Sequence, residues 1–117
     1  MLTLDAIHER IEACSDRLDS LYGELRKAAR EAAEAEAAFK VSFAKARLTC
    51  REEADRDKIK VTVDLVEDVA TEATANERFA HLLASNKLLT LREALRATQS
   101  QMDGYRTEAA SHRIAGG

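Results

Sequence analysis

The residues that could carry out chemistry are few and lie far apart along the chain. His8 and Glu12 stand four residues apart, a spacing that puts two metal ligands on one face of a helix, but a third ligand at a usable spacing is missing. His81 lies beside a leucine-rich stretch, which predicts a partly buried structural histidine. His112 lies at the end of a periodic apolar series, where fraying or a subunit contact is expected. The sequence contains no nucleophile elbow and no glycine-rich phosphate-binding motif. We therefore expect a protein that is not an enzyme and has no metal or cofactor.

The two cysteines also predict no special chemistry. If Cys14 and Cys50 share one helix, they lie roughly 54 Å apart, whereas a disulfide needs Cα atoms within about 7 Å of each other. Free thiols are typical of a reducing cytoplasm. The opening segment MLTLDAIHERIE has no basic region followed by an apolar run, and no stretch is apolar enough to cross a membrane. These features predict a soluble cytoplasmic protein with no membrane contact.

Basic residues gather in the middle of the chain and could contact nucleic acid. The candidates are Lys45, Arg47, Arg51, Arg56, Lys58 and Lys60. Four carboxylates at positions 52, 53, 55 and 57 dilute this charge, and aromatic residues, on which single-stranded nucleic acids stack, make up only 4% of the chain. The set is interpreted mainly as the solvated end of a hairpin, with nucleic-acid binding as the alternative.

Composition indicates the class of fold that must position these residues. The chain of 117 residues is long enough for one domain. It contains no proline and only four glycines, which are too few turn residues for an all-β fold. Hydrophobic residues make up 45% and charged residues 33%, with many alanines, leucines, glutamates and arginines, as in long helices. We expect an all-α protein.

A repeating apolar series predicts a long first helix over residues 4–48. Steps of three and four residues connect thirteen positions, of which all but Ser42 are apolar. The positions are Leu4, Ile7, Ile11, Cys14, Leu18, Leu21, Leu25, Ala28, Ala32, Ala35, Phe39, Ser42 and Ala46. Thr3 is the expected N-cap, and the helix is expected to run through Gly23, which lies off the series. A helix of this length must be one arm of a coiled-coil-like hairpin.

The pattern is lost over residues 49–57, TCREEADRD, which we interpret as the turn, and the second arm is expected over residues 58–112. Residues 59–66 fit two structures. Their alternating, β-branched pattern resembles a strand, but they also continue a series of three- and four-residue steps into the second helix. Helix is favoured because a single strand would have no pairing partner. A break in this helix is expected near residues 62–64. Residues 113–117 are expected to fray.

The second arm carries more apolar residues than one helix face holds. A series through Val66, Val69, Ala73 and Leu83 takes a five-residue step before it resumes at Leu88. Around that step lies a set of large apolar residues that we predict to form an interface: Phe79, Leu82, Leu83, Leu88, Leu89 and Leu91. A hairpin of two helices cannot bury them all, which predicts self-association into a homo-oligomeric bundle.

Charge supports an antiparallel hairpin. The net charge is −3, but residues 1–38 hold five basic and nine acidic side chains, whereas residues 78–117 hold six basic and three acidic ones. Folding the chain back on itself brings these oppositely charged segments side by side.

Several stretches resemble a group of small all-helical accessory proteins of tailed bacteriophages. They are AAEAEAAFK at 32–40, KARL at 45–48, RDKIKV at 56–61 and LREALRATQSQMDGYRTEA at 91–109. The sequence departs from the group's pattern at Thr98, where leucine is more usual, and in the turn. The resemblance implies a phage protein in the bacterial cytoplasm, of a kind often encoded near recombination and replication functions, and it implies no site residues.

Three functions remain open from the sequence. The first is a structural or adaptor protein that acts through self-association and through helix–helix contacts with a phage or host protein. The second is an accessory factor in phage DNA recombination or replication that contacts nucleic acid through the basic hairpin tip. The third is a small inhibitor of a host protein.

Overall fold

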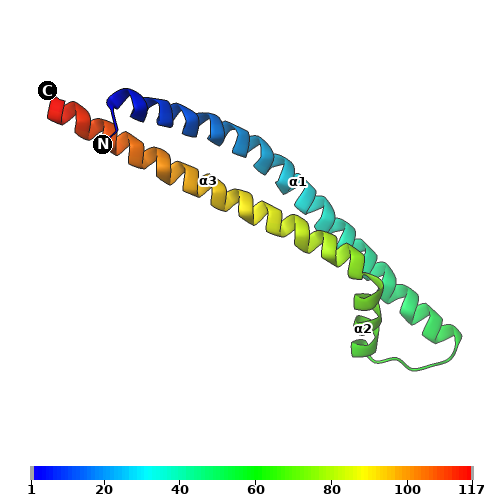
Figure 1. Ribbon diagram of the computed structural model, residues 1–117. Coiled ribbons are helices and arrows are strands. Elements are labelled where there is room, and N and C mark those ends of the chain that lie inside the picture. Colours follow the sequence, from blue (N-terminus) through cyan, green and yellow to red (C-terminus); the bar gives the residue numbers. More distant parts are fainter. Residues whose placement is uncertain (1, 117) are drawn as a thin grey trace. The chain divides into compact units, whose positions relative to one another are not determined.

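The computed structural model of the protein describes residues 2–116, which form three helices and no strand (Figure 1). Helix α1 spans Leu4–Arg56, α2 spans Val63–Ala73 and α3 spans Ala75–Gly116. The predicted all-α class is therefore confirmed. Within the described residues, no helix is both long and apolar enough to span a membrane.

The chain divides into two compact units, each of which contains antiparallel helical segments. The terminal unit combines residues up to Ala28 with residues from Leu88 onward, and the middle unit comprises Ala29–Lys87. In the terminal unit, α1 and α3 run antiparallel, since Arg10 contacts Tyr105 and Tyr22 contacts Gln99. In the middle unit, Glu31 pairs with Lys87, and Phe39 packs on His81. The predicted antiparallel helical hairpin is thus confirmed.

Helix α1 begins and packs as its sequence predicts. Thr3 caps it, because its hydroxyl accepts a hydrogen bond from the Ala6 N–H at 3.2 Å and its carbonyl accepts one from Ile7 at 3.0 Å. The helix continues through Gly23, which is exposed. All thirteen positions of the predicted apolar series are buried or half-buried, and Ile7 is completely buried.

Helix α1 ends later than predicted, so the expected turn at residues 49–57 is wrong for residues 49–56. Cys50 is half-buried and Ala54 is 7% exposed, which continues the inward-facing series in four-residue steps. The helix stops where Lys58 adopts a left-handed φ of 56°. Its N–H bonds to the Asp55 carbonyl at 3.2 Å, and the Ile59 N–H bonds to the Ala54 carbonyl at 2.8 Å. This is the Schellman arrangement, which sequence analysis missed because a lysine occupies the usual glycine position.

Residues 59–62 are neither helix nor strand, which corrects the expected helical start at residue 58. Thr62 has extended backbone angles, and its hydroxyl accepts a hydrogen bond from the Leu65 N–H at 3.1 Å. This N-cap starts α2 at Val63, close to the break that the sequence placed near residues 62–64. The alternating, β-branched residues thus mark the non-helical approach to α2.

Thr74 forms an elbow between α2 and α3 that the sequence did not predict. Its backbone N–H and its hydroxyl both donate to the Ala70 carbonyl, at 3.1 and 2.7 Å, and close α2. Its own carbonyl accepts a hydrogen bond from the Arg78 N–H at 2.9 Å and opens α3. The side chain is only 2% exposed. Because threonine satisfies these groups without glycine or proline, nothing in the composition marks the break.

The inward-facing seam of the second arm differs from the predicted one in its first half. Its positions, each buried or half-buried, are Thr74, Glu77, His81, Ala84, Leu88, Leu91, Leu95, Thr98, Met102, Tyr105, Ala109 and His112. Their steps alternate between three and four residues without the predicted five-residue step. Val69, Ala73 and Leu83, which the sequence placed on the seam, are exposed. The prediction was wrong because the polar residues Thr74, Glu77 and His81 occupy seam positions here, while apolar residues lie on the exposed side of the helix.

The last residues of the second arm are also more regular than expected. Helix α3 continues to Gly116, although residues 113–117 were expected to fray. Gly117 lies outside the described residues. The expected end of the arm near residue 112 therefore marks only the last inward-facing position, His112.

Candidate protein-interaction surface

Helix α3 exposes large apolar side chains on the side away from the seam. Phe79 is 67% exposed, Leu82 49% and Leu83 60%. At 3.6 residues per turn, these three lie roughly 130–170° around the helix from the direction midway between seam residues His81 and Ala84. Folding of the hairpin therefore does not cover them.

Leu89 extends this exposed surface along the same helix. It is 53% exposed and lies seven residues after Leu82, which is two helical turns. We call Phe79, Leu82, Leu83 and Leu89 the apolar stripe. The other two residues of the predicted interface, Leu88 and Leu91, are half-buried and belong to the seam. The predicted set thus divides into four outward-facing and two inward-facing residues.

A shallow groove of about 410 Å³ lies in the elbow and adjoins the apolar stripe. Its lining residues are Thr71, Glu72, Ala75, Arg78, Phe79 and Leu82. The floor is mainly apolar, while Glu72 and Arg78 supply one charge of each sign. A groove that combines small and large apolar groups with charges at its edge is typical of a surface that receives a side chain from a partner helix.

Aromatic packing in the middle unit fixes which side of α3 faces inward. The His81 imidazole stacks on the Phe39 ring, with centroids 5.8 Å apart and planes inclined by 18°. Phe39 also contacts Phe43 edge to face, at 5.9 Å between centroids. The Nδ1 atom of His81 is buried and has no hydrogen-bond partner among the described residues. This packing holds His81 inward and so turns Phe79 outward.

Ion pairs support the same part of α1. Lys40 lies 2.9 Å from Glu36, and Lys87 lies 3.6 Å from Glu31. The hydrogen bond from Lys40 lowers the pKa of the Glu36 carboxyl, the positive charge of Lys40 lowers it further, and His81 adds a smaller effect in the same direction. Both members of the Glu36–Lys40 pair are largely exposed, so the pair adds little stability.

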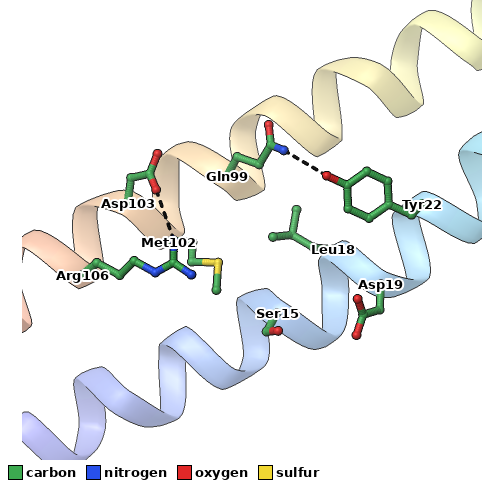
Figure 2. A pocket seen from close by; sticks show the side chains of 8 residues that line it. All are labelled: Ser15, Leu18, Asp19, Tyr22, Gln99, Met102, Asp103 and Arg106. Carbon is green, nitrogen blue, oxygen red and sulfur yellow. Dashed lines mark hydrogen bonds and ion pairs between the residues drawn. The ribbon is translucent and has the colours of Figure 1, made fainter.

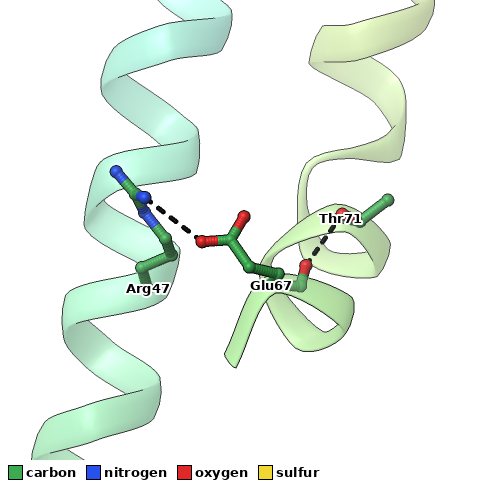
Figure 3. Close-up of polar contacts among 3 residues, drawn as sticks. All are labelled: Arg47, Glu67 and Thr71. Atoms are coloured by element: carbon green, nitrogen blue, oxygen red, sulfur yellow. Dashed lines mark hydrogen bonds and ion pairs between the residues drawn. The ribbon is translucent and has the colours of Figure 1, made fainter. Parts of the chain in front are cut away.

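Arg47, one of the six candidate nucleic-acid contacts, is engaged inside the middle unit. Its guanidinium lies 3.2 Å from the carboxylate of Glu67 on α2, and the two groups point toward each other (Figure 3). The guanidinium also lies over the Phe43 ring, 5.1 Å from its centroid. The Thr71 hydroxyl donates to the Glu67 carbonyl at 2.8 Å. Arg47 therefore joins α2 to α1, a role that the sequence did not predict.

The other five candidate contacts are exposed. They are Lys45, Arg51, Arg56, Lys58 and Lys60. None of them forms an ion pair with any residue between 2 and 116. The four carboxylates at positions 52, 53, 55 and 57 are exposed beside them, so this surface carries both signs of charge. Electrostatic binding of nucleic acid needs several cations without neighbouring anions.

The terminal unit has a separate groove of about 450 Å³ between α1 and α3 (Figure 2). Leu18 and Met102 lie in it, and the Gln99 amide donates to the Tyr22 hydroxyl at 3.2 Å across its mouth. Arg106 lies 3.8 Å from Asp103 on the same helix. The groove is also lined by Ser15 and Asp19, and its lining residues include neither histidine nor cysteine.

Within residues 2–116, no three His, Cys, Asp or Glu side chains lie close enough together to hold a metal ion. His8 and Glu12, the pair noted for their spacing, are both exposed on α1. Cys14 is buried and Cys50 half-buried, and both are free thiols.

No protein-family model, curated protein sequence or solved structure matches this chain. Functional inference consequently rests on the chain's own residues. Among these, the apolar stripe and the adjoining elbow groove form one apolar surface that the hairpin leaves uncovered.

Proposed function

We propose that this protein is a non-enzymatic structural or adaptor protein that works by binding other helices through the apolar stripe. The observation that carries the proposal is the exposure of Phe79, Leu82, Leu83 and Leu89 on the side of α3 opposite the seam. At these exposures each side chain presents roughly 100 Å² to solvent, or roughly 400 Å² in total. A contiguous apolar patch of that size on a soluble protein is commonly a binding site.

The shape of this surface favours a helix as its ligand. The stripe residues recur at steps of three, four and seven along α3, the spacing at which one helix packs against another. The elbow groove beside Phe79 and Leu82 offers room for a side chain of the bound helix. The resemblance to phage accessory proteins supports a phage or host protein in the bacterial cytoplasm as the source of that helix.

The proposal is tested by capture from phage-infected bacterial cells, with and without nuclease, using three tagged forms. These are the wild type, Leu83→Asp in the stripe, and Leu48→Asp as the matched control. Leu48 is 56% exposed on α1, close to the 60% of Leu83, but lies outside the stripe. Mass spectrometry should identify a protein that survives nuclease with the wild type and Leu48→Asp and is lost with Leu83→Asp.

Two results would contradict the proposal. Equal capture by Leu83→Asp and the wild type would exclude the stripe as the binding surface. Capture that depends on intact nucleic acid would instead favour the accessory role in recombination or replication. An inhibitor would give the same capture as an adaptor, and inhibition of the captured protein in a purified assay would identify it as one.

A further inference from the structure

We infer that the terminal unit binds a phosphate group in a small groove between α1 and α3. The groove holds about 240 Å³ and shares no lining residue with the groove of Figure 2. Its lining residues are Arg10, Ala13, Cys14, Arg17, Gln101 and Tyr105. All six belong to the terminal unit and none to the apolar stripe, so the inference goes beyond the proposed function.

The charge of this groove is positive. Among the described residues that line it, the two charged ones are Arg10 and Arg17. Both are exposed, and neither forms an ion pair with any residue between 2 and 116. Residues 1–38 nevertheless hold nine acidic side chains. The five nearest in sequence, at positions 5, 9, 12, 16 and 19, lie at least roughly 80° around the helix from both arginines. The edge of α1 that carries the arginines is therefore free of acidic residues over this range.

Two carboxylates lie beyond the ends of the groove and limit the anion that it accepts. Glu24 follows Arg17 by seven residues, which is two helical turns. Glu108 follows Tyr105 by three residues and lines a separate hollow near the end of α3. Neither carboxylate forms an ion pair within residues 2–116. A long polyanion such as nucleic acid would extend toward these negative charges, whereas a single phosphate group fits between them.

Tyr105 positions Arg10 beside the groove before a ligand binds. The guanidinium carbon of Arg10 lies 5.7 Å from the centroid of the tyrosine ring. Its Nη1 atom donates a hydrogen bond to the Tyr105 hydroxyl at 3.5 Å. This bond uses one of the five N–H donors of the guanidinium and leaves the others for an anion. Because the side chain is already restricted, it loses less conformational freedom on binding.

The donors around the groove match the chemistry of phosphate. Arg10 and Arg17 are seven residues apart, roughly 10 Å along α1, so each side chain has to cover only about half of that distance to reach one shared anion. A guanidinium can donate two parallel hydrogen bonds to phosphate oxygens. Gln101, an exposed residue of α3, supplies amide N–H donors. A phosphate group in the groove therefore has donors on both helices.

A titration followed by nuclear magnetic resonance tests the site. The purified full chain, labelled with nitrogen-15, is titrated with inorganic phosphate at constant ionic strength. Saturable shifts should appear at the amides of residues 10–17 and 101–105 and at the Nε–H groups of the two arginines. Because exposed charges attract each other weakly, the dissociation constant should be on the order of 1 mM. Shifts that do not saturate, or that spread over the whole chain, would overturn the inference.

Charge variants test which side chains bind the phosphate. Arg10→Gln and Arg17→Gln should each weaken binding by about tenfold, because each removes charge-assisted hydrogen bonds. The matched control is Arg96→Gln, since Arg96 is an exposed arginine of the same unit without an ion pair in residues 2–116. All three variants should keep the helical circular dichroism of the wild type. Equal weakening by Arg96→Gln, or none by the other two, would contradict the site.

Glu108→Gln gives a change in the opposite direction. It removes the negative charge that lies closest to the groove along α3, so phosphate should bind more tightly. Weaker binding by this variant would contradict the electrostatic argument.

A second titration distinguishes the source of the phosphate group. Adenosine monophosphate, a phosphomonoester, is compared with inorganic phosphate, and adenosine serves as the uncharged control. Tighter binding of the monophosphate would identify a phosphomonoester as the ligand, and equal binding would identify the free ion, so either result supports the site. Equal binding of adenosine and its monophosphate would overturn the inference, because the phosphate would then contribute nothing.

The phosphate site and the proposed function can fail separately. Leu83→Asp changes the middle unit and should leave phosphate binding unchanged, while Arg10→Gln and Arg17→Gln should leave capture through the apolar stripe unchanged. A chain that binds phosphate but captures no protein supports the site and contradicts the proposed function. Capture without saturable phosphate binding contradicts the site alone.

Discussion

The imidazole of His81 on α3 stacks on the ring of Phe39 on α1, with centroids 5.8 Å apart. A polar ring thus occupies the seam, although Phe79, Leu82 and Leu83 lie nearby on the outer side of the same helix. For the hairpin alone, the reverse arrangement would bury more apolar surface. The observed arrangement lowers the stability of the isolated hairpin and leaves exposed the apolar side chains that we propose as the binding surface.

Replacing His81 with leucine should stabilise the hairpin. The buried Nδ1 atom has no hydrogen-bond partner within residues 2–116, and removing an unsatisfied buried polar atom gains about 1 kcal/mol. Leucine also suits the seam, as Leu88 shows one heptad later. Urea unfolding followed by circular dichroism should show a higher midpoint with an unchanged m value. A lower midpoint would mean that stacking on Phe39 outweighs the orphaned nitrogen.

Lys58→Gly should stabilise the end of α1. The left-handed conformation of Lys58 costs a residue with a side chain about 1–2 kcal/mol, a cost that glycine avoids. Glycine also has more conformational freedom in the unfolded chain, which cancels part of this gain. We expect a net gain of about 0.5–1 kcal/mol in the free energy of unfolding. The control is Lys60→Gly, where φ is not positive. The control should gain nothing, and equal gains at both positions would contradict this explanation.

The Glu36–Lys40 pair predicts a small pH dependence of stability. Because Lys40 holds the pKa of Glu36 below the usual value of 4.5, the folded chain binds the proton more weakly than the unfolded chain. The stabilisation is therefore complete above pH 4.5 and is lost as the pH falls through the lowered pKa. Glu36→Gln should flatten the acid side of the pH profile slightly, and 1 M salt should remove the difference between the two proteins. A difference that persists in salt would contradict a screened, exposed pair.

Reversing charges at the hairpin end should leave the function intact. Arg51→Glu, Arg56→Glu and Lys60→Glu change exposed residues that form no ion pair within residues 2–116. The triple variant should capture the same proteins as the wild type after nuclease treatment. A gel-shift assay provides the contrary outcome. If the wild type binds DNA in a salt-sensitive manner and the triple variant does not, the protein has a nucleic-acid role instead.

The sequence predicted α1 well because every seam position but Ser42 is apolar. The sequence did not predict the helix ends that lack glycine or proline. Lys58 adopts a left-handed conformation, which a glycine at that position would have indicated. Thr74 interrupts the second arm through hydrogen bonds that no sequence pattern indicates. Polar side chains on the seam, such as His81, shifted the predicted phase of the helix.

The candidate site was partly predictable for the same reason. The excess of apolar residues around Phe79 and Leu83 indicated a surface that a hairpin cannot bury. Assigning Leu88 and Leu91 to that surface required the true phase of α3, which depends on His81 facing Phe39. The contact between Arg47 and Glu67 joins two helices across the turn, and no local pattern predicts such a pairing.

The most direct test of the central claim is photo-cross-linking in cells. A benzophenone amino acid is placed at Phe79 in the stripe or, as the control, at Leu48, and the cells are irradiated. The account predicts a discrete covalent adduct at position 79, to a second copy or to another protein, and none at position 48. Absence of an adduct at position 79, or equal adducts at both positions, would contradict the claim that this protein acts through the apolar stripe.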